Sequence, residues 1–374
     1  MKKQEKTRKQ ARFTNKENNT AGNKHQYAYG KIDSSVRSSE EDYLYGKAKN
    51  TKEKSYNNYQ GINSFQSEVG QFEAPEVPRT DLALEVRETF EDDDVEIRGV
   101  ILTEDYDDEN DIQVTTVVIK DKKAAKVMRK PIGTYVTIEA PRLNEGDESY
   151  HEPVAREIAK QLKNIIGNVK HKEVLVAGLG NRDVTPDALG PEVVDNLFVT
   201  RHLIKEYGDE FQTEHNLVNV SAISPGVMGQ TGMETSEIIK GIIKETNPSL
   251  VIVIDALASR SVNRLNTTVQ ITDTGICPGS GVGNNRQALN KESLGVDVIA
   301  LGVPTVVDAA TIVNDTMEHF MENQGFEPSE IQQFNTELNE QIIYNMFVTP
   351  KNIDESIKRI SFTISEALNS CFAG

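Results

Sequence analysis

The feature that most constrains this chain is a series of short, mainly apolar runs that alternate with helical segments from about residue 170 onward. Runs such as Val174–Leu179 and Leu250–Asp255 lack the polar alternation of a strand with one exposed face. Short apolar runs of this kind are typical of strands that are buried on both faces of a parallel sheet. The alternation therefore predicts an α/β protein with a doubly wound, mainly parallel sheet flanked by helices.

Further elements follow from the same patterns. In this region we expect strands at Val174–Leu179, Leu217–Ile223, Leu250–Asp255 and Val298–Val303, and helices over about 191–204, 234–246 and 308–320. Three β-branched runs earlier in the chain predict an additional antiparallel β unit near the N-terminus, namely Val95–Thr103, Ile112–Lys120 and Thr134–Ala140. Amphipathic helices are expected over 151–166 and 353–368.

The domain organisation follows from a change in composition. The first part of the chain is rich in Lys, Asn, Gln, Ser and Glu, so it cannot bury enough apolar surface to offset the entropy of ordering. We interpret it as a disordered leader or propeptide region that precedes one α/β peptidase domain. The expected boundaries are 1–78 for the leader and 79–374 for the domain, with an antiparallel β subdomain at 95–140, a βαβ core at 170–320 and a helical region at 321–374.

Charge and composition exclude several classes of protein. The formal net charge is −17, and the leader is the basic part, so the body is strongly acidic and no direct nucleic-acid partner is expected. No apolar stretch approaches the ~20 residues that span a bilayer, and no secretory signal opens the chain. The two cysteines, Cys277 and Cys371, show no metal-binding spacing. We expect a cytoplasmic protein without a cofactor.

Two acidic residues occupy positions where parallel sheets bind their ligands. In such sheets the ligand lies outside the carboxyl ends of the strands, against the loops that follow them. Asp255 ends one apolar run, and Asp187 lies in the loop after Val174–Leu179, ahead of a helix opened by Pro191. The rule therefore predicts that both carboxylates face one crevice.

Two carboxylates in one crevice do not readily ionise together, so the pKa of one rises and the pair shares a proton. Such a pair activates water against a peptide carbonyl and protonates the leaving nitrogen. Taken alone, Asp187 is equally consistent with a helix N-cap, and Asp255 with a loop anchor. Their joint position favours an endopeptidase in which Asp187 and Asp255 are catalytic, and falling pH is then expected to favour the singly protonated pair.

Loops at the same edge supply candidate contacts to a substrate. The Gly-rich run over 275–283 permits close approach of a substrate backbone. The histidines form no HExxH motif and lie outside these loops, so no metal site is expected. The candidates for substrate contact are Asn181, Gly226, Gly279 and Gly281.

A series of motifs follows one after another between about residues 79 and 320. They are Arg79-Thr80-Asp81-Leu82-Ala83, Gly178-Leu179-Gly180-Asn181 with Thr185-Pro186-Asp187, Ser224-Pro225-Gly226-Val227, Asp255-Ala256-Leu257-Ala258-Ser259-Arg260, Asp273-Thr274-Gly275 with Pro278-Gly279-Ser280-Gly281, and Gly302-Val303-Pro304-Thr305. Together these motifs resemble the spore germination protease family.

The resemblance implies an endopeptidase of spore-forming bacteria that is made as a zymogen and degrades small acid-soluble spore proteins at germination. It also implies a homotetramer in the forespore or spore core, a fold related to the hydrogenase-maturation endopeptidases, and an atypical aspartic-type mechanism. On matching motifs, the two important aspartates of the family fall on Asp187 and Asp255. The self-processing cut falls between Asp81 and Leu82, where we expect an exposed, extended segment that a protease accepts.

The chain departs from the family pattern in two ways. Its leader is longer than the usual short propeptide of the family. Relatives often carry His at the position of Cys277, and a thiol does not replace an imidazole in proton transfer near neutral pH.

Other interpretations stay open. The chain is also consistent with a metal-dependent endopeptidase of the hydrogenase-maturation type, or with a non-catalytic module that binds spore proteins. A dinucleotide site after Leu179 is disfavoured, because Asp183 stands where the third glycine of that motif is needed. The tripeptide Asp273-Thr274-Gly275 mimics a pepsin-type signature, and we expect Asp273 to be structural or to lie at the rim of the cleft.

Overall fold

The computed structural model describes residues 80–91, 97–145, 148–170, 172–282, 286–326, 330 and 346–373. All of them belong to one compact unit, Ala74–Gly374. The leader expected over residues 1–78 and part of the helical region expected over 321–374 lie outside the described residues.

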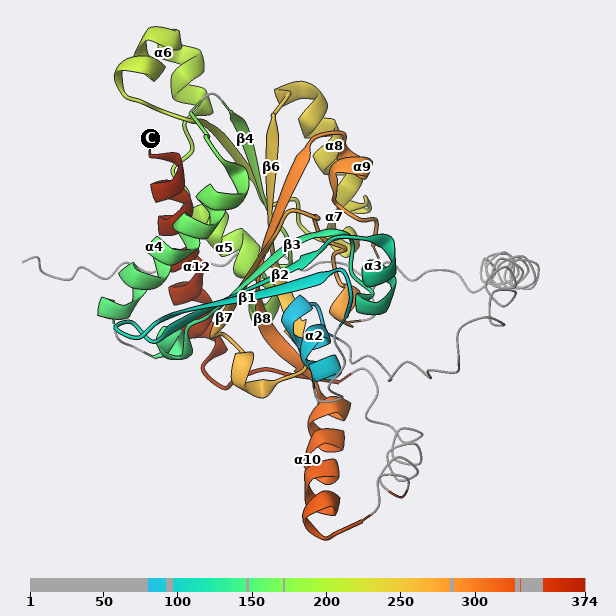
Figure 1. Ribbon diagram of the computed structural model, residues 1–374. Helices are drawn as coiled ribbons and strands as arrows, with labels where there is room; N and C mark the ends of the chain where they lie inside the picture. Colours follow the sequence, from blue (N-terminus) through green and yellow to red (C-terminus); the bar gives the residue numbers. More distant parts are fainter. Residues whose placement is uncertain are drawn as a thin grey trace, which may run out of the picture. The chain divides into compact units, whose positions relative to one another are not determined.

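The described strands form a single nine-stranded sheet in the order β1-β2-β3-β7-β8-β6-β4-β5, with β9 paired to β8 (Figure 1). Its parallel half consists of β8 (Asp297–Asp308), β6 (Leu250–Ser259), β4 (Glu173–Gly178) and β5 (Asn219–Ile223). Every residue of β6 except Ala256 is buried. The predicted α/β class is therefore confirmed, and the apolar runs are strands covered on both faces.

The antiparallel half is a continuation of the same sheet rather than an addition to it. It contains β1 (Val100–Asp107), β2 (Ile112–Ile119), β3 (Gly133–Glu139) and β7 (Thr268–Thr272). The sequence patterns did not predict β7. This strand pairs with β3 on one side and β8 on the other, and so joins the two halves. The short β9 (Phe347–Val348) pairs with the end of β8.

Helices cover both faces of the parallel half (Figure 1). On one face, α4 (Glu148–Ile166), α5 (Leu189–Asp195) and α12 (Ile353–Phe372) share the largest hydrophobic core with the strands. On the other face, α8 (Thr235–Thr246) and α9 (Lys291–Leu294) close a second core. The remaining α-helices of the described residues are α2 (Ala83–Glu91), α3 (Lys122–Met128), α6 (Arg201–Glu214), α7 (Met228–Thr231) and α10 (Ala309–Asn323).

The single helix predicted from Pro191 to Ile204 is wrong, because the chain forms two helices there. α5 ends at Asp195, and α6 begins only at Arg201. Between them, Thr200 binds the end of the sheet: its hydroxyl donates to the Val218 carbonyl and accepts from the Val220 N–H at 2.9 Å. These contacts bind Thr200 to the sheet and so interrupt the single helix that the apolar spacing predicts.

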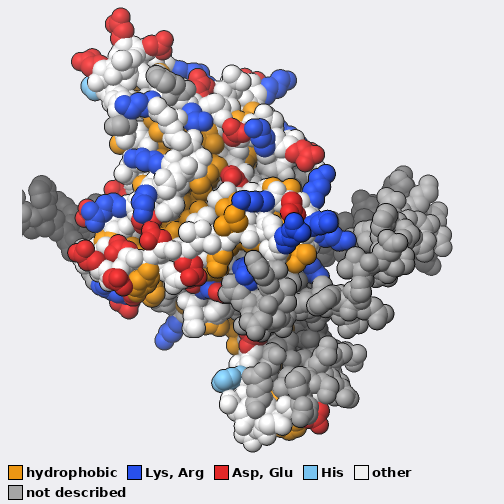
Figure 2. Space-filling model, in the orientation of Figure 1, with side chains coloured by type: hydrophobic (Ala, Val, Ile, Leu, Met, Phe, Trp, Pro, Cys, Tyr) orange, Lys and Arg blue, Asp and Glu red, His pale blue; other side chains and the backbone are white. Residues whose placement is uncertain are grey.

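The visible face of the molecule carries acidic and basic side chains interspersed with apolar atoms (Figure 2). None of the helices within the described residues combines the length and the apolar character that a bilayer crossing requires.

The packing of α12 predicts a large stability difference between two of its residues. Ile360 is 0% exposed in the main core, whereas Phe362 on the same helix is 52% exposed. We expect Ile360→Ala to lower the free energy of unfolding by about 2–5 kcal/mol, because it removes apolar contacts and leaves a cavity. Phe362→Ala is the matched control and is expected to change it by less than about 1 kcal/mol. Urea denaturation measures both, and equal losses would contradict this description of the core.

Candidate active site

A cleft of about 860 Å³ opens at the carboxyl ends of the parallel strands. The chain passes from β4 to β5 on one side and then crosses to β6 on the other, so the strand order switches direction between β4 and β6. Ligands of doubly wound sheets bind at such a switch point. The lining residues from the strand ends and their loops include Gly180, Pro186, Asp187, Gly226, Asp255, Ala258, Gly279 and Thr305.

Asp255 is positioned by its strand. β4 ends at Gly178, which pairs with Ile254, whereas β6 continues beside β8 to Ser259. Asp255 is therefore the first residue of β6 past the end of β4, and its side chain is only 5% exposed. The sequence placed it at the end of the strand, but β6 runs four residues further because β8 continues alongside it.

Burial raises the pKa of Asp255 well above its ordinary value, and the nearby charges of Asp187 and Asp81 raise it further. The N–H of Ala256 donates to Asp255 Oδ1 at 3.0 Å and offsets only a part of this effect. Asp255 is thus a carboxyl group that keeps its proton at a higher pH than an exposed aspartate.

Asp187 is positioned by a loop that folds back on itself. The N–H of Asn181 donates both to Asp187 Oδ2, at 2.8 Å, and to the Asp187 carbonyl, at 3.0 Å. This closure requires glycine at 180, because a Cβ there would lie 1.9 Å from the Asp187 carbonyl oxygen and the φ angle is +111°. From β8, the Thr305 hydroxyl donates to the Pro186 carbonyl at 2.7 Å and ties the loop to the sheet.

Partial burial raises the pKa of Asp187 to about 6, while the hydrogen bond from Asn181 lowers it. The sequence suggested that the following helix would favour the anion, but desolvation is the larger effect. The two acids therefore lie in unequal surroundings: the pKa of Asp187 is raised to about 6, and the pKa of Asp255, which is buried more deeply, is raised well above its ordinary value. A pair with separated pKa values can supply one base and one acid to the same reaction.

A third carboxylate, Asp81, occupies the same cleft. Its Oδ2 accepts from the Ala258 N–H at 2.9 Å, and its Oδ1 accepts from the Ser280 hydroxyl at 2.7 Å. The Asp81 N–H in turn donates to the Ala258 carbonyl at 3.0 Å. Gly281 lies directly against this carboxylate, since a Cβ at 281 would be 2.2 Å from Asp81 Oδ2.

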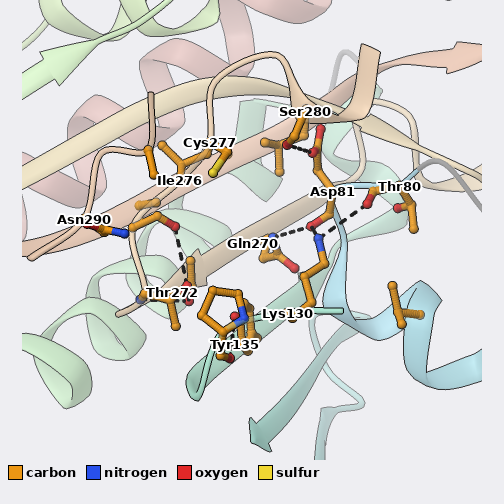
Figure 3. Close-up of a pocket in the computed structure, with 18 of the residues that line it drawn as sticks. Thr80, Asp81, Lys130, Tyr135, Gln270, Thr272, Ile276, Cys277, Ser280 and Asn290 are labelled. Carbon is orange, nitrogen blue, oxygen red and sulfur yellow. Dashed lines mark hydrogen bonds between the residues drawn. The ribbon is translucent and has the colours of Figure 1, made fainter. Parts of the chain in front are cut away.

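The main chain of Asp81 is held as firmly as its side chain (Figure 3). The Lys130 ammonium donates to the Asp81 carbonyl at 2.8 Å, and the Gln270 amide donates to the same oxygen at 3.1 Å. Both side chains border a second pocket of about 370 Å³, which Asp81 and Cys277 also line. The peptide unit that follows Asp81 is therefore fixed from the side of β7.

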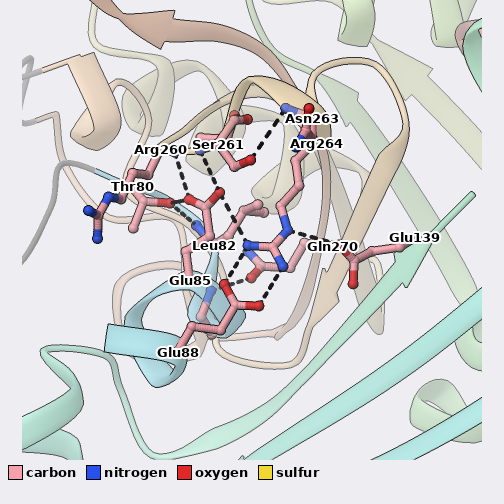
Figure 4. Close-up of polar contacts among 12 residues, drawn as sticks. Thr80, Leu82, Glu85, Glu88, Glu139, Arg260, Ser261, Asn263, Arg264 and Gln270 are labelled. Atoms are coloured by element: carbon pink, nitrogen blue, oxygen red, sulfur yellow. Dashed lines mark hydrogen bonds and ion pairs between the residues drawn. The ribbon is translucent and has the colours of Figure 1, made fainter. Parts of the chain in front are cut away.

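Four residues after Asp81, the chain is anchored by the buried Glu85 (Figure 4). Its carboxylate accepts from the N–H groups of Arg260, at 2.7 Å, and Ser261, at 3.0 Å. Arg264 lies 3.4 Å from the same carboxylate, and the Thr80 hydroxyl donates to it. The predicted exposed segment is therefore wrong: Leu82 and Ala83 are 0% exposed, because the segment is docked against the loop after β6.

The four residues predicted to contact a substrate differ in whether they face the aspartate pair. Gly226 and Gly279 line the cleft beside Asp187 and Asp255. Asn181 instead lies behind the Asp187 carboxylate and accepts from Gln230 Nε2 at 3.0 Å. Gly281, as described above, faces Asp81.

Other candidates raised by the sequence lie away from the cleft. Asp273 accepts from the Thr134 N–H at 2.8 Å, at the end of the β3–β7 pair, and does not line the cleft. None of the described histidines lines it either, and no cluster of three or more potential metal-ligating residues occurs among the described residues. Cys277 is exposed and Cys371 is buried, and both are free thiols.

Lys130, Gln270 and Ser280 were not predicted as site residues. The signal for Gln270 was available, because a lone amide within Thr268–Thr272 stands among residues that all prove to be buried. Ser280 lies inside the Gly-rich run, whose pattern indicates backbone flexibility and not a role for the serine hydroxyl. For Lys130 the sequence offers no comparable signal.

The cleft lies at the strand ends of an α/β sheet, and contacts to the backbone and to the carboxylate of Asp81 hold a peptide segment in it. These features define a peptide-binding α/β protein. Comparison with known proteins gives its chemistry. A family model described as Germination protease matches residues 76–341. The chain belongs to the germination protease family, and it is an endopeptidase.

The relatives support this assignment over most of the chain. A germination protease of Caldanaerobacter subterraneus subsp. tengcongensis is 49% identical over 306 residues, which cover 78% of this chain and 93% of that protein. One from Clostridium perfringens is 45% identical over 307 residues, covering 78% and 94%. One from Bacillus subtilis is 48% identical over 256 residues, covering 67% and 68%.

Among solved structures, the [NiFe] hydrogenase maturation protease HycI of Thermococcus kodakarensis matches 56% of this chain and 98% of its own. The sequence identity is 18% and the TM-score is 0.29, so this likeness carries no further argument.

The close contact at Gly281 yields a prediction about the docked segment. In Gly281→Ala, the new methyl group meets the Asp81 carboxylate and also lies 2.7 Å from the Ala258 Cβ. The carboxylate must then leave its donors, a loss of about 1.5–3 kcal/mol for hydrogen bonds to a charged group. We expect the amide protons of residues 82–86 to exchange about 10–100-fold faster, as measured by mass spectrometry.

Gly241→Ala is the matched control, because a Cβ at that position in α8 meets no atom within 4 Å. It is expected to leave exchange in residues 82–86 unchanged. Equal exchange in both variants would contradict the described contact between Gly281 and Asp81.

Proposed function

We propose that this chain is a spore germination endopeptidase made as a zymogen, which cuts itself between Asp81 and Leu82 and then cleaves small acid-soluble spore proteins. In this proposal Asp187 and Asp255 act as an atypical aspartic-type dyad, and the mature enzyme is a homotetramer in the spore core. One observation carries the proposal: Asp187 and Asp255 line the same cleft that already holds Asp81.

The unequal surroundings of the two acids support separate roles for them. Asp187, with a pKa of about 6, is assigned as the base, and Asp255, whose burial raises its pKa well above the ordinary value, is assigned as the acid. A water oxygen forms a bond to the Asp81 carbonyl carbon while Asp187 takes its proton. The bond between this carbon and the Leu82 nitrogen then breaks, and the nitrogen takes the proton of Asp255. Transfer of a proton from Asp187 to Asp255 restores the pair.

Docking of the segment supports processing within one molecule. Contacts on both sides of the Asp81–Leu82 bond hold it against the enzyme: Asp81 binds Ala258 and Ser280, and Glu85 binds the loop after β6. Fixing a bond beside its catalytic groups avoids the entropic cost of a bimolecular encounter. A buried bond is therefore compatible with self-processing, although it is poorly accessible to another protease.

The first test replaces each acid of the pair. We expect Asp187→Asn and Asp255→Asn each to slow self-processing and cleavage of a small acid-soluble spore protein by about 10²–10⁴-fold, because each removes a proton-transfer group. Mass spectrometry of the new N-terminus and gel assays measure the two reactions. A mature N-terminus far from Leu82 would contradict the proposed cut.

Asp183→Asn and Asp273→Asn are the matched controls, the first in the same loop as Asp187 and the second outside the cleft. Both are expected to retain the parent rates. Loss of cleavage in Asp273→Asn together with full activity in Asp187→Asn would assign the chemistry to a different pair. A chelator is expected to leave the rate unchanged, and a loss that added metal restores would favour the metal-dependent alternative.

The pH dependence follows from the two shifted pKa values. The active form requires an ionised Asp187 and a protonated Asp255, so the rate should rise as the pH increases through about 6. Below about pH 6 this is the reverse of the expectation from the sequence that falling pH favours the singly protonated pair. It should fall again at higher pH, where Asp255 loses the proton that its raised pKa retains. A rate of precursor conversion that stays constant between about pH 5 and pH 7 would contradict this assignment.

A further inference from the structure

We propose that Lys130 and Gln270 form the oxyanion-binding site of this protease and stabilise the negative charge that develops on the carbonyl oxygen of the bond being cut. The inference rests on the proposed cleavage between Asp81 and Leu82, and it adds catalytic residues that lie outside the aspartate pair. In self-processing the relevant oxygen is that of Asp81, which both side chains contact in the uncut chain.

Two side-chain donors converge on this one oxygen. Lys130 Nζ lies 2.8 Å from it and Gln270 Nε2 lies 3.1 Å from it. A backbone carbonyl in a docked segment is satisfied by a single neutral donor, whereas a cation and an amide together match an oxygen that becomes negatively charged. Donors that are already in place require no reorganisation when the charge forms.

The surroundings of Lys130 strengthen the assignment. Its side chain is partly buried, and desolvation lowers its pKa. Among the residues that the structure describes, no salt bridge joins its ammonium to a carboxylate, although the nearby charges of Asp81 and Glu85 offset a part of the desolvation. Its hydrogen-bond acceptors are the carbonyl oxygens of Asp81, at 2.8 Å, and Thr80, at 3.4 Å. A desolvated cation whose direct partners are neutral carbonyl oxygens is stabilised further when one of these oxygens becomes negatively charged.

The fold fixes the direction of this lysine. Helix α3 ends at Met128, which is 0% exposed and anchors it, and the left-handed conformation of the following residue, Arg129, turns the chain. Pro131 follows directly, and its carbonyl accepts from the Tyr135 hydroxyl at 2.9 Å. Lys130 therefore projects from a tightly held turn toward the Asp81 carbonyl (Figure 3).

Gln270 fixes both sides of the bond that is cut. While its Nε2 contacts the Asp81 oxygen, its Oε1 accepts from the Ala83 N–H at 2.7 Å. Its own position is set by β7, which is hydrogen-bonded on both edges. One side chain thus spans Leu82 and holds the carbonyl of the residue before it and the N–H of the residue after it.

The chemistry divides cleanly between the two groups of residues. When water adds to the Asp81 carbonyl carbon, an electron pair of the C=O bond moves to the oxygen, which becomes negatively charged. The N–H groups of Lys130 and Gln270 stabilise this charge by donating hydrogen bonds to the oxygen. When the bond to the Leu82 nitrogen breaks, that pair re-forms the C=O bond. Proton transfer to and from water and nitrogen remains with the aspartates, so neither acid has to protonate the carbonyl oxygen.

The test compares lysine substitutions in the full-length chain, with leader release followed by mass spectrometry. Lys130→Met removes the cation while keeping a long unbranched side chain, and we expect processing to slow about 10²–10³-fold. Lys126→Met is the matched control, because it makes the same change at an exposed position of α3. It should retain the parent rate, and Lys130→Arg should recover a part of the loss.

A second measurement separates stabilisation of the oxyanion from simple docking. In an Asp255→Asn background, where the segment stays uncut, hydrogen exchange in residues 82–86 is expected to change less than about threefold on adding Lys130→Met. Gln270→Glu keeps an acceptor for the Ala83 N–H but loses the donor to the Asp81 oxygen, so it should also process slowly.

The outcomes distinguish the two proposals. Parent-like processing in Lys130→Met, or a rate loss matched by an equal loss of exchange protection, would overturn the oxyanion assignment and leave the aspartate pair standing. Absence of cleavage after Asp81 in the unsubstituted chain would overturn both proposals. Full activity in Asp187→Asn together with slow Lys130→Met would overturn only the dyad.

Discussion

The candidate site depends on a difference in length between neighbouring parallel strands. β4 stops opposite Ile254, while β6 continues beside β8 as far as Ser259. Asp255 therefore stands on a strand that is still fully hydrogen-bonded on one edge, at the point where the other edge opens into the cleft. The burial that shapes the strand also desolvates the carboxyl group, so its position and its raised pKa have one cause.

Asp187 lines the same cleft as Asp255, but it lies on a loop and not on a strand. Its loop is closed by contacts from Asn181 and by the glycine at 180, and it keeps partial access to solvent. A rigid, desolvated acid next to a hydrogen-bonded, partly exposed one gives the pair two distinct affinities for protons. If the two carboxyl groups had identical surroundings, their mutual repulsion would still separate the two ionisation steps, but neither group would be favoured as the base or as the acid.

Sequence patterns predicted the parallel half of the sheet and the meeting of Asp187 and Asp255, because apolar runs and the strand-end rule act locally. They failed where distant contacts decide the structure. β7 was missed since its buried residues are mainly threonine and glutamine, and the break before α6 depends on Thr200 binding β5. Lys130 was missed because its direction depends on a left-handed turn at the end of α3. The apolar residues from Leu82 to Val86 did signal burial, but the polar leader before them favoured an exposed segment.

The docked segment relates these parts of the site to each other. On the N-terminal side of the proposed cut, Asp81 is held by Ala258, Ser280, Lys130 and Gln270, and on the C-terminal side Glu85 is held by the loop after β6. Cleavage between Asp81 and Leu82 separates these two sets of contacts. The C-terminal part would stay attached to the folded body through α2, whereas the described residues on the N-terminal side, Thr80 and Asp81, would be held by non-covalent contacts alone and could dissociate. The position vacated by Asp81 then offers hydrogen-bond donors for a carboxylate and for a carbonyl oxygen, which suits an acidic residue of an incoming protein substrate.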